Sequence, residues 1–264
     1  MLTRMLALLA AALTCACGGR DEASTGFPTG RWVDLTHEFA RDTVYWPTAD
    51  GFKLRVDFKG VTDKGYFYAS NSYQASEHGG THIDAPFHFA DGKKTVEEIP
   101  VERLVGEAGV IDVSAQAHQD PDYRVTQQDL TDWEAEHGRL PAIVLINTGF
   151  HKYWPDRKRY MGTDERGPEA VKKLHFPGLH HEAAQWLVEH RDVRAVGLDT
   201  PSIDYGQSTE FKTHRILFEK NIPAFENVAN LDALPATGAW VIALPMKIRN
   251  GTGGPLRIVA LVPE

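Results

Sequence analysis

Four side chains that bind metal ions or move protons fall within eleven consecutive residues of this chain, in the stretch SEHGGTHIDAPFHF at residues 76–89. They are His78, His82, Asp84 and His88. All four have even numbers, so an extended backbone would place their side chains on one face. In a straight strand His78 and His82 would lie roughly 13 Å apart. Two ligands of one ion must instead converge, with bonds near about 2.1 Å.

The backbone must therefore bend inside this stretch, and its glycines and proline allow that. Gly79 and Gly80 supply a backbone able to bend or bulge, and Pro86 stiffens the segment that carries His88. The same residues oppose a helix, which separates the pattern from the helical H-E-x-x-H metal site. The spacing favours a metal site on a strand and a turn over a set of exposed or core histidines.

The composition limits which partners and which metal ligands this chain can use. The chain has 264 residues and a formal net charge of −8, with no Lys/Arg-rich run, which argues against nucleic acid or an anionic membrane as the main partner. A small molecule is the expected partner. Both cysteines, Cys15 and Cys17, lie near the N-terminus, so the remaining chain has no disulfide and no thiol nucleophile. A metal site must then be built from nitrogen and oxygen ligands.

The first residues follow the order of a secretory signal peptide, with Arg4, then an apolar run at 5–13, then small residues. The apolar run is too short for a permanent membrane span. The letters TCAC resemble the end of a bacterial lipoprotein signal, with Cys17 as the lipidated residue. Thr14 departs from that pattern, so plain cleavage and release to the periplasm stays open. Either way we expect an exported protein, with the membrane contacted only through a lipid anchor.

The rest of the chain predicts a single β-rich α/β domain of mixed sheet with flanking helices. KLRVDF and YFYASNSY alternate as half-buried strands do, whereas GVIDV, AIVLINT, RAVGLD, WVIALPM and LRIVALV suit buried strands. Helices are expected at TQQDLTDWEAEHG, which opens with a capping-box pattern, and at GLHHEAAQWLVEH and HRILFEKN. The predicted organisation is a signal peptide at 1–17, a flexible tether at 18–30 and one domain at 31–264.

The stretch HGGTHIDAPFHF closely resembles the H-x-G-T-H-x-D-x-P-x-H-F signature of the cyclase family of metal-dependent hydrolases. VDLTHEF, VYWP and GLDTPSID resemble further family segments, while residues 114–175 match no motif. The resemblance implies the family's swivelling β/β/α fold. It also implies a divalent metal, Mn²⁺ or Zn²⁺, held by His78, His82 and Asp84, with His214 and Glu226 completing that site or binding a second ion.

The same resemblance implies roles for the residues around the metal. His88 would take and return protons, and Ser202 would contact substrate or relay protons through water. A flat aromatic substrate would lie against Trp46, Tyr45 and Phe89. Asp199, at a strand end beside the metal, would also contact the substrate.

The expected activity is hydrolysis of a small aryl or cyclic amide by metal-activated water, similar to the ring opening of isatin by the isatin hydrolases of the family. The chain length and ALPMKIRNGTGGPLRIVAL favour that side of the family. Two alternatives stay open: an arylformamidase of the kynurenine formamidase type, which export disfavours, and a non-catalytic metal- or ligand-binding lipoprotein with the same fold. The resemblance also implies a homodimer or homotetramer.

Overall fold

A computed structural model describes residues 29–263. Its strands are β1 (Gly30–Asp34), β2 (Lys53–Val61), β3 (Phe67–Gln74), β4 (His82–Asp84), β5 (Val105–Asp112), β6 (Arg124–Val125), β7 (Ile143–Asn147), β8 (Gly178–Leu179), β9 (Ala195–Leu198), β10 (Ala224–Glu226), β11 (Ala239–Pro245) and β12 (Gly253–Pro263). Its α-helices are α1 (Ser114–Gln119), α2 (Gln127–His137), α3 (Arg157–Met161), α4 (Pro168–Val171), α5 (His181–His190) and α6 (Lys212–Glu219). The predicted signal peptide and nearly all of the predicted tether lie outside the described residues.

Eight strands form one mixed sheet in the order β1-β12-β11-β5-β7-β9-β10-β4. Strands β5, β7, β9 and β10 run parallel, whereas the other neighbours are antiparallel. The sheet closes because β4 pairs with β10 on one side and with the start of β12 on the other. The prediction of a mixed sheet is confirmed, and the closure places the short strand β4 between two longer parts of the sheet.

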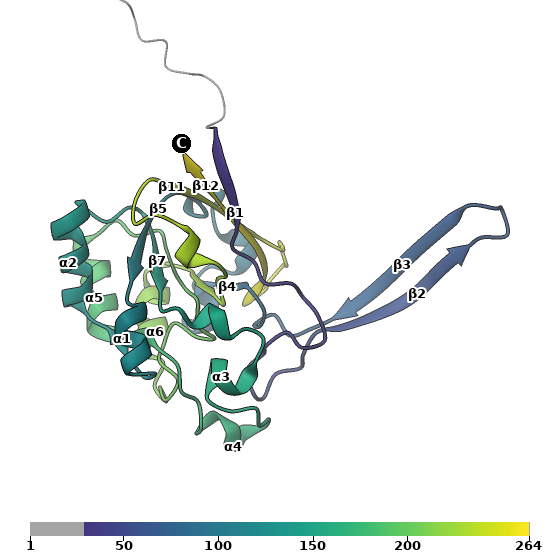
Figure 1. Ribbon diagram of the computed structural model, residues 1–264, viewed down its shortest axis with the longest axis horizontal. Coiled ribbons are helices and arrows are strands. Elements are labelled where there is room, and N and C mark those ends of the chain that lie inside the picture. The colour runs from purple at the N-terminus through teal and green to yellow at the C-terminus, as the bar shows by residue number, and fades with distance from the viewer. Residues whose placement is uncertain (1–28, 264) are drawn as a thin grey trace, which may run out of the picture.

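The β-branched runs form strands that are buried on both faces. All five residues of β7 are buried, because one face looks into the closed sheet and the other lies under helices. One buried cluster, including Phe225, Val241 and Ile258, fills the inside. A second, including Trp133 and Leu187, lies between the sheet and the helices α2, α5 and α6, which are grouped on the side of the body away from the β2–β3 hairpin (Figure 1).

The three predicted helices form with nearly the expected ends. Thr126 caps α2, since its side chain accepts from the Asp129 N–H while the Asp129 carboxylate accepts from the Thr126 N–H, and Gly138 follows the last turn at φ 87°. Leu179 is the exception, because it belongs to β8 instead of the apolar face of α5. No helix within residues 29–263 is long and apolar enough to cross a membrane.

The prediction of half-buried strands is wrong for β2 and β3. These strands pair only with each other and project from the body as one long hairpin, here called the arm (residues 53–74; Figure 1). Nearly every residue of both strands is exposed. Alternation of apolar and polar residues predicts a strand, but whether another layer covers its apolar face depends on what packs against it.

Residues 150–176, which except for Phe176 belong to the region without a recognisable motif, form a third packed unit. It contains α3 and α4 and has its own buried cluster, which includes Phe150, Tyr160, Met161 and Phe176. Val44 belongs to the same cluster, and Trp46 packs against it. This unit therefore lies beside the VYWP segment, which carries the predicted substrate contacts Tyr45 and Trp46.

Candidate metal centre and its cavity

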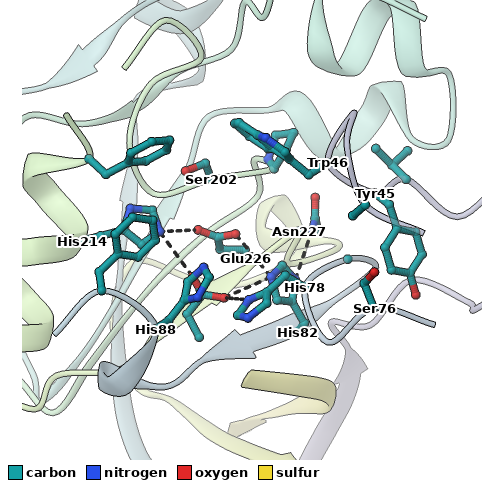
Figure 2. A pocket seen from close by; sticks show the side chains of 17 residues that line it. Tyr45, Trp46, Ser76, His78, His82, His88, Ser202, His214, Glu226 and Asn227 are labelled. Atoms are coloured by element: carbon teal, nitrogen blue, oxygen red, sulfur yellow. Dashed lines mark hydrogen bonds and ion pairs between the residues drawn. The ribbon is translucent and has the colours of Figure 1, made fainter. Parts of the chain in front are cut away.

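Three elements of distant sequence bring the predicted ligands together. His82 and Asp84 lie at the two ends of β4, and the antiparallel register of β4 with β10 sets Glu226 opposite His82. His214 comes from α6, and His78 from the loop before β4. Figure 2 shows the side chains of His78, His82, His214 and Glu226 pointing into one cavity, which Asp84 also lines.

The predicted bend before β4 is present at Gly79 and Gly80, whose φ angles are 157° and 61°. Both glycines also lack space for a side chain. A Cβ atom on Gly79 would lie 2.0 Å from the ring of Tyr45, and one on Gly80 would lie 2.6 Å from the ring of Phe39. The bend therefore requires glycine for its backbone angles and for the close approach of two aromatic rings.

Three histidine nitrogens face two buried carboxylates. Nδ1 of His78 lies 2.7 Å from Oδ1 of Asp84. Nε2 of His82 lies 3.1 Å from the same oxygen and 3.4 Å from Oε2 of Glu226. Nε2 of His214 lies 3.2 Å from Oε1 of Glu226 and 3.3 Å from Oδ2 of Asp84.

The other ring nitrogen of His82 and of His214 is engaged with an acceptor outside the cluster. Nδ1 of His82 donates to the Gly80 carbonyl at 2.9 Å, and Nδ1 of His214 donates to the Asp204 carboxylate at 2.6 Å. In a neutral imidazole this leaves Nε2 as a lone pair directed at the carboxylates. Nε2 of His82 is buried and has no hydrogen bond of normal geometry.

His78 follows the same pattern with its two nitrogens exchanged. The Thr252 hydroxyl donates to Glu77 at 2.6 Å, so it accepts from Nε2 of His78 at 2.7 Å. Nδ1 of His78 is then the lone pair that faces Asp84. Lone pairs and carboxylates at this range repel one another unless a cation lies between them, and the outer hydrogen bonds are those that orient metal-binding histidines. The residues present thus fit a divalent metal ion.

The pKa shifts within the cluster also indicate a site for positive charge. Burial alone would lower the pKa of His214, but Asp204, Asp84 and Glu226 raise that pKa well above its ordinary value. Burial and the neighbouring carboxylate of Asp84 raise the pKa of Glu226. The cavity floor therefore favours positive charge, supplied by protons or by a metal ion.

The possible ligands fall into two sets that share Asp84. One set is His78, His82 and Asp84, and the other is Asp84, His214 and Glu226. Within each set the ligand atoms lie within 4.8 Å of one another. The described residues therefore offer enough donors to hold one ion with several ligands or two ions.

Above the cluster is a cavity of about 420 Å³. Its apolar lining includes the predicted Trp46, Tyr45 and Phe89, joined by Val44, Pro201 and Phe211. Every predicted ligand also borders the cavity, as do His88 and Ser202. A mostly apolar pocket with a few convergent polar groups suits a small aromatic molecule.

His88 lies beside the ligands without belonging to either set. Its ring stacks on His78, with ring centroids 3.8 Å apart and an interplanar angle of 18°. Burial is the largest influence on this ring and lowers the pKa of His88 to about 4, with Asp84 raising it and the other histidines of the cluster lowering it. At neutral pH the ring is therefore uncharged and has a nitrogen able to accept a proton.

Asp199 is the one predicted site residue that does not line the cavity, so the expected substrate contact is not supported. Its carboxylate is fully buried and is occupied by other partners. Oδ1 accepts from the Thr148 N–H at 2.8 Å and hydroxyl at 2.7 Å, and Oδ2 accepts from Nδ1 of His151 at 2.9 Å. Because these bonds join the ends of β9 and β7, Asp199 fixes the loop behind the site.

Three further residues of the site were not predicted. Asp204 and Thr252 hold the outer nitrogens of His214 and His78, and Asn227 lines the cavity while donating to the Gly80 carbonyl at 2.7 Å. Asp204 follows Ser202 by only two residues within GLDTPSID, which was a usable signal. Thr252 lies in the glycine-rich stretch NGTGGP.

The chain combines a closed mixed sheet with a cluster of His, Asp and Glu side chains under an aromatic cavity. Comparison with known proteins identifies the class of protein that has these features. Residues 33–205 match the family model described as "Putative cyclase", and the chain belongs to this cyclase family. It is 37% identical over 242 residues to isatin hydrolase of Roseibium aggregatum, covering 88% of this chain and 87% of that protein. It is 28% identical over 233 residues to kynurenine formamidase of Bacillus cereus, covering 88% and 97%.

Solved structures agree with the sequence comparison. Isatin hydrolase A from Labrenzia aggregata, bound to benzyl benzoate, aligns with a TM-score of 0.79 at 36% identity, covering 89% of this chain and 94% of that chain. Isatin hydrolase A from Ralstonia solanacearum aligns with the same TM-score at 33% identity, covering 88% and 92%. The predicted family and fold class are confirmed.

Proposed function

We propose that this chain is a metal-dependent hydrolase that opens the cyclic amide of isatin or of a closely similar aryl amide. The observation that carries the proposal is the set of three histidine lone pairs and two buried carboxylates at the floor of an aromatic-lined cavity. The 37% identity to an isatin hydrolase over most of both chains supports the choice of substrate class.

The ligand residues are those already predicted: His78, His82, Asp84, His214 and Glu226. Imidazole and carboxylate donors suit Mn²⁺ and Zn²⁺, and the donor set does not choose between them. When bound, the ion would lower the pKa of a water toward about 7 and polarise the amide carbonyl.

The chain's own residues move the proton and hold the substrate. His88 accepts a proton from the attacking water on a ring nitrogen and returns it to the amide nitrogen as the C–N bond breaks. The water oxygen ends on the carbonyl carbon, one water proton ends on the amine nitrogen, and the other is released when the carboxylic acid ionises, so no other reactant is needed. Ser202, nearly buried at the cavity wall, contacts the substrate, and Trp46 provides the flat apolar surface against the ring.

Kynurenine formamidase relatives make an arylformamide the second candidate substrate. The test compares kcat/KM of the metal-loaded protein for isatin and for N-formylkynurenine, each followed by absorbance. Faster turnover of isatin is expected. Faster turnover of N-formylkynurenine would move the assignment to the formamidase, and bound metal without turnover of any amide, lactam or ester would indicate a non-catalytic binding protein.

We also propose that the protein assembles as a homodimer through the arm. Eight large apolar side chains of the arm are exposed, namely Leu54, Val56, Phe58, Val61, Tyr66, Phe67, Tyr68 and Tyr73. These side chains lie on both faces of the hairpin, since Phe67 and Tyr68 are consecutive in β3, and together they present about 700 Å². A partner that wraps the arm could therefore bury an area close to the roughly 800 Å² per partner of a stable interface. A two-stranded hairpin is also marginally stable alone.

The charges of the arm support a second copy of this chain as the partner that binds it. The arm carries four basic and two acidic side chains, whereas the whole chain has a net charge of −8. An arm of net positive charge is thus complementary to the acidic body of another copy.

Export is the remaining part of the proposal. The order of charge, apolar run and small residues at 1–17 supports a signal peptide, and TCAC supports lipidation of Cys17. Mass spectrometry of the exported protein tests it. A diacyl adduct on Cys17 would mean anchoring by more than one chain, an unmodified later start would mean release, and an intact Met1 in the cytosol would contradict export.

A further inference from the structure

One wall of the cavity, formed by Tyr45 and Trp46, is bonded both to the metal-binding loop and to residues outside the motifs that identify the family. The segment Val44–Ala49 carries Tyr45 and Trp46, and it is bonded on one side to the metal-binding loop. Gly80 N–H donates to the Val44 carbonyl at 3.0 Å, and Tyr45 forms a β-bridge with Gly79. The position of this wall is therefore linked to the backbone that presents the ligands.

On its other side the wall is bonded to the unit at residues 150–176. Nη1 of Arg157, the first residue of α3, donates to the Tyr45 carbonyl at 2.9 Å. Nη2 donates to the Glu165 carbonyl at 3.3 Å. One planar guanidinium thus joins the wall to the loop after α3, which is a geometry that a lysine cannot reproduce in full.

Two further contacts follow along the same segment. Gly167 N–H donates to the Pro47 carbonyl at 2.9 Å, and the Arg166 side chain donates to the Ala49 carbonyl. Arg157 differs from Arg166 in burial, since Arg166 is exposed while Arg157 is half-buried with its Nε enclosed. Burial is also the main reason that the pKa of Arg157 is lowered.

The side chains of the wall rest on the same unit. The Trp46 ring meets Phe176 edge-on, with centroids 6.4 Å apart, and lies 6.5 Å from Phe211. Loss of the Arg157 bonds would leave the Tyr45 carbonyl unpaired and allow this ring to shift, without removing any ligand of the metal. The expected consequence is weaker substrate binding at an intact centre.

We infer that Arg157 is a positioning residue that fixes the Tyr45–Trp46 wall and thereby sets the affinity for flat aromatic substrates. This inference rests on the proposed function for the identity of the substrate. Residues 150–176 would then have a role in substrate binding, because they hold one wall of the cavity in place.

Arg157→Ala tests the inference through a split between KM and kcat. We expect KM for isatin to rise about tenfold, the effect of losing a part-buried hydrogen bond from a charged group. Both kcat and metal content should stay within about threefold, because the lost interaction stabilises the bound substrate and the transition state equally. Arg157→Lys keeps one donor and should restore part of the affinity. Lys158→Ala, the exposed neighbour on α3, is the matched control and should leave both constants unchanged.

A double variant separates positioning from general loss of structure. If Arg157 acts through the wall, Arg157→Ala should add little to KM in a Trp46→Ala background. Full additivity of the two effects contradicts the inference, as does a KM unchanged in Arg157→Ala. If Arg157→Ala does not fold, an unchanged KM in Arg157→Lys would likewise contradict the inference.

Failure of the proposed function would be recognised separately. If the metal-loaded wild type does not turn over isatin, its affinity for isatin and the affinities of Arg157→Ala and Lys158→Ala are measured by calorimetry. Binding without turnover in the wild type would reject isatin hydrolysis, yet an affinity lowered only in Arg157→Ala would still support the positioning role. Equal affinity in all three would reject it.

Discussion

At the scale of single residues, the site depends on which nitrogen of each histidine is free. Gly80, Asp204 and Thr252 occupy the outer nitrogens, so the inner ones can only face the carboxylates. The two carboxylates and the three histidine lone pairs would repel one another on their own. A bound cation compensates the carboxylate charges, which makes this cluster of five ionisable groups compatible with a folded protein.

His82→Ala and Asp84→Ala should each lose bound metal and activity together. His82 supplies a buried nitrogen with no other use, and Asp84 belongs to both ligand sets, so neighbouring groups cannot replace them. Metal content by mass spectrometry, measured beside the rate, checks this. Full metal content in both variants would contradict the ligand assignment.

Asp204→Asn should weaken metal binding by about 10- to 100-fold while added metal restores activity, because Asp204 orients His214 without being a ligand itself. Titration of metal-stripped protein measures the affinity. Ser208→Ala is a suitable control, since Ser208 also contacts Asp204, with its hydroxyl 3.1 Å from Oδ1, but does not contact His214. An Asp204→Asn affinity equal to that of the wild type would contradict the orienting role.

His88→Ala should keep the metal, since the ring lies outside both ligand sets, while turnover falls by roughly 10² to 10⁴, the usual contribution of a positioned acid or base. A joint loss of metal and activity, partly restored by added metal, would make His88 a ligand. A near-normal rate with bound metal would overturn the proton-transfer role.

The residues of this site could be predicted to unequal degrees. The even spacing of His78, His82 and Asp84 around two glycines is local, so sequence alone indicated a site. His214 and Glu226 came only from the family resemblance, because nothing in their spacing shows that β10 and α6 meet β4. The outer partners were missed because threonine and aspartate in loops are common in any chain.

At the scale of elements, hydrophobic patterns predicted the buried strands and three helices but not how they are covered. The arm shows the limit, since its strands alternate like half-buried ones although no layer of the described chain covers them. Similarly, no motif marked residues 150–176, yet their packing against Trp46 shapes the cavity. Contacts between segments far apart in sequence decide both features.

The arm should be required for assembly. Phe67→Asp combined with Tyr68→Asp should shift the protein from dimer to monomer, since charges replace two exposed rings at the interface. Light scattering after size exclusion measures the mass. Gln119→Asp, an exposed change on α1, adds charge elsewhere and should leave the mass unchanged. A wild-type protein that is monomeric at micromolar concentration would contradict the dimer.

At the scale of the whole molecule, closure of the sheet explains the burial of the metal centre, because β4 is held between β10 and β12. The sequence predicted a mixed sheet but not this closure, since three-residue strands carry almost no pattern.

The burial of His37 should make the stability of the whole molecule depend on pH. Burial, assisted by His151 and opposed by Asp199, lowers the pKa of His37 to about 4 from 6.5.

Above pH 6.5 His37 is neutral in both folded and unfolded chains and costs nothing. As the pH falls from 6.5 toward 4 the unfolded chain binds the proton first, so stability should decline by at most about 3 kcal/mol. His37→Phe, which can keep the stacking on Trp154, should flatten this decline in urea unfolding followed at several pH values. An identical pH dependence in the variant and the wild type would count against it.

The most direct test of metal-dependent hydrolysis is turnover of isatin by metal-stripped protein as Mn²⁺ or Zn²⁺ is added in measured amounts. We expect no turnover without metal, activity that rises with bound metal until the site is full, and no recovery in His82→Ala at the same metal concentration. Full turnover by the stripped protein, or equal recovery by His82→Ala, would contradict a metal-dependent hydrolase built on this cluster.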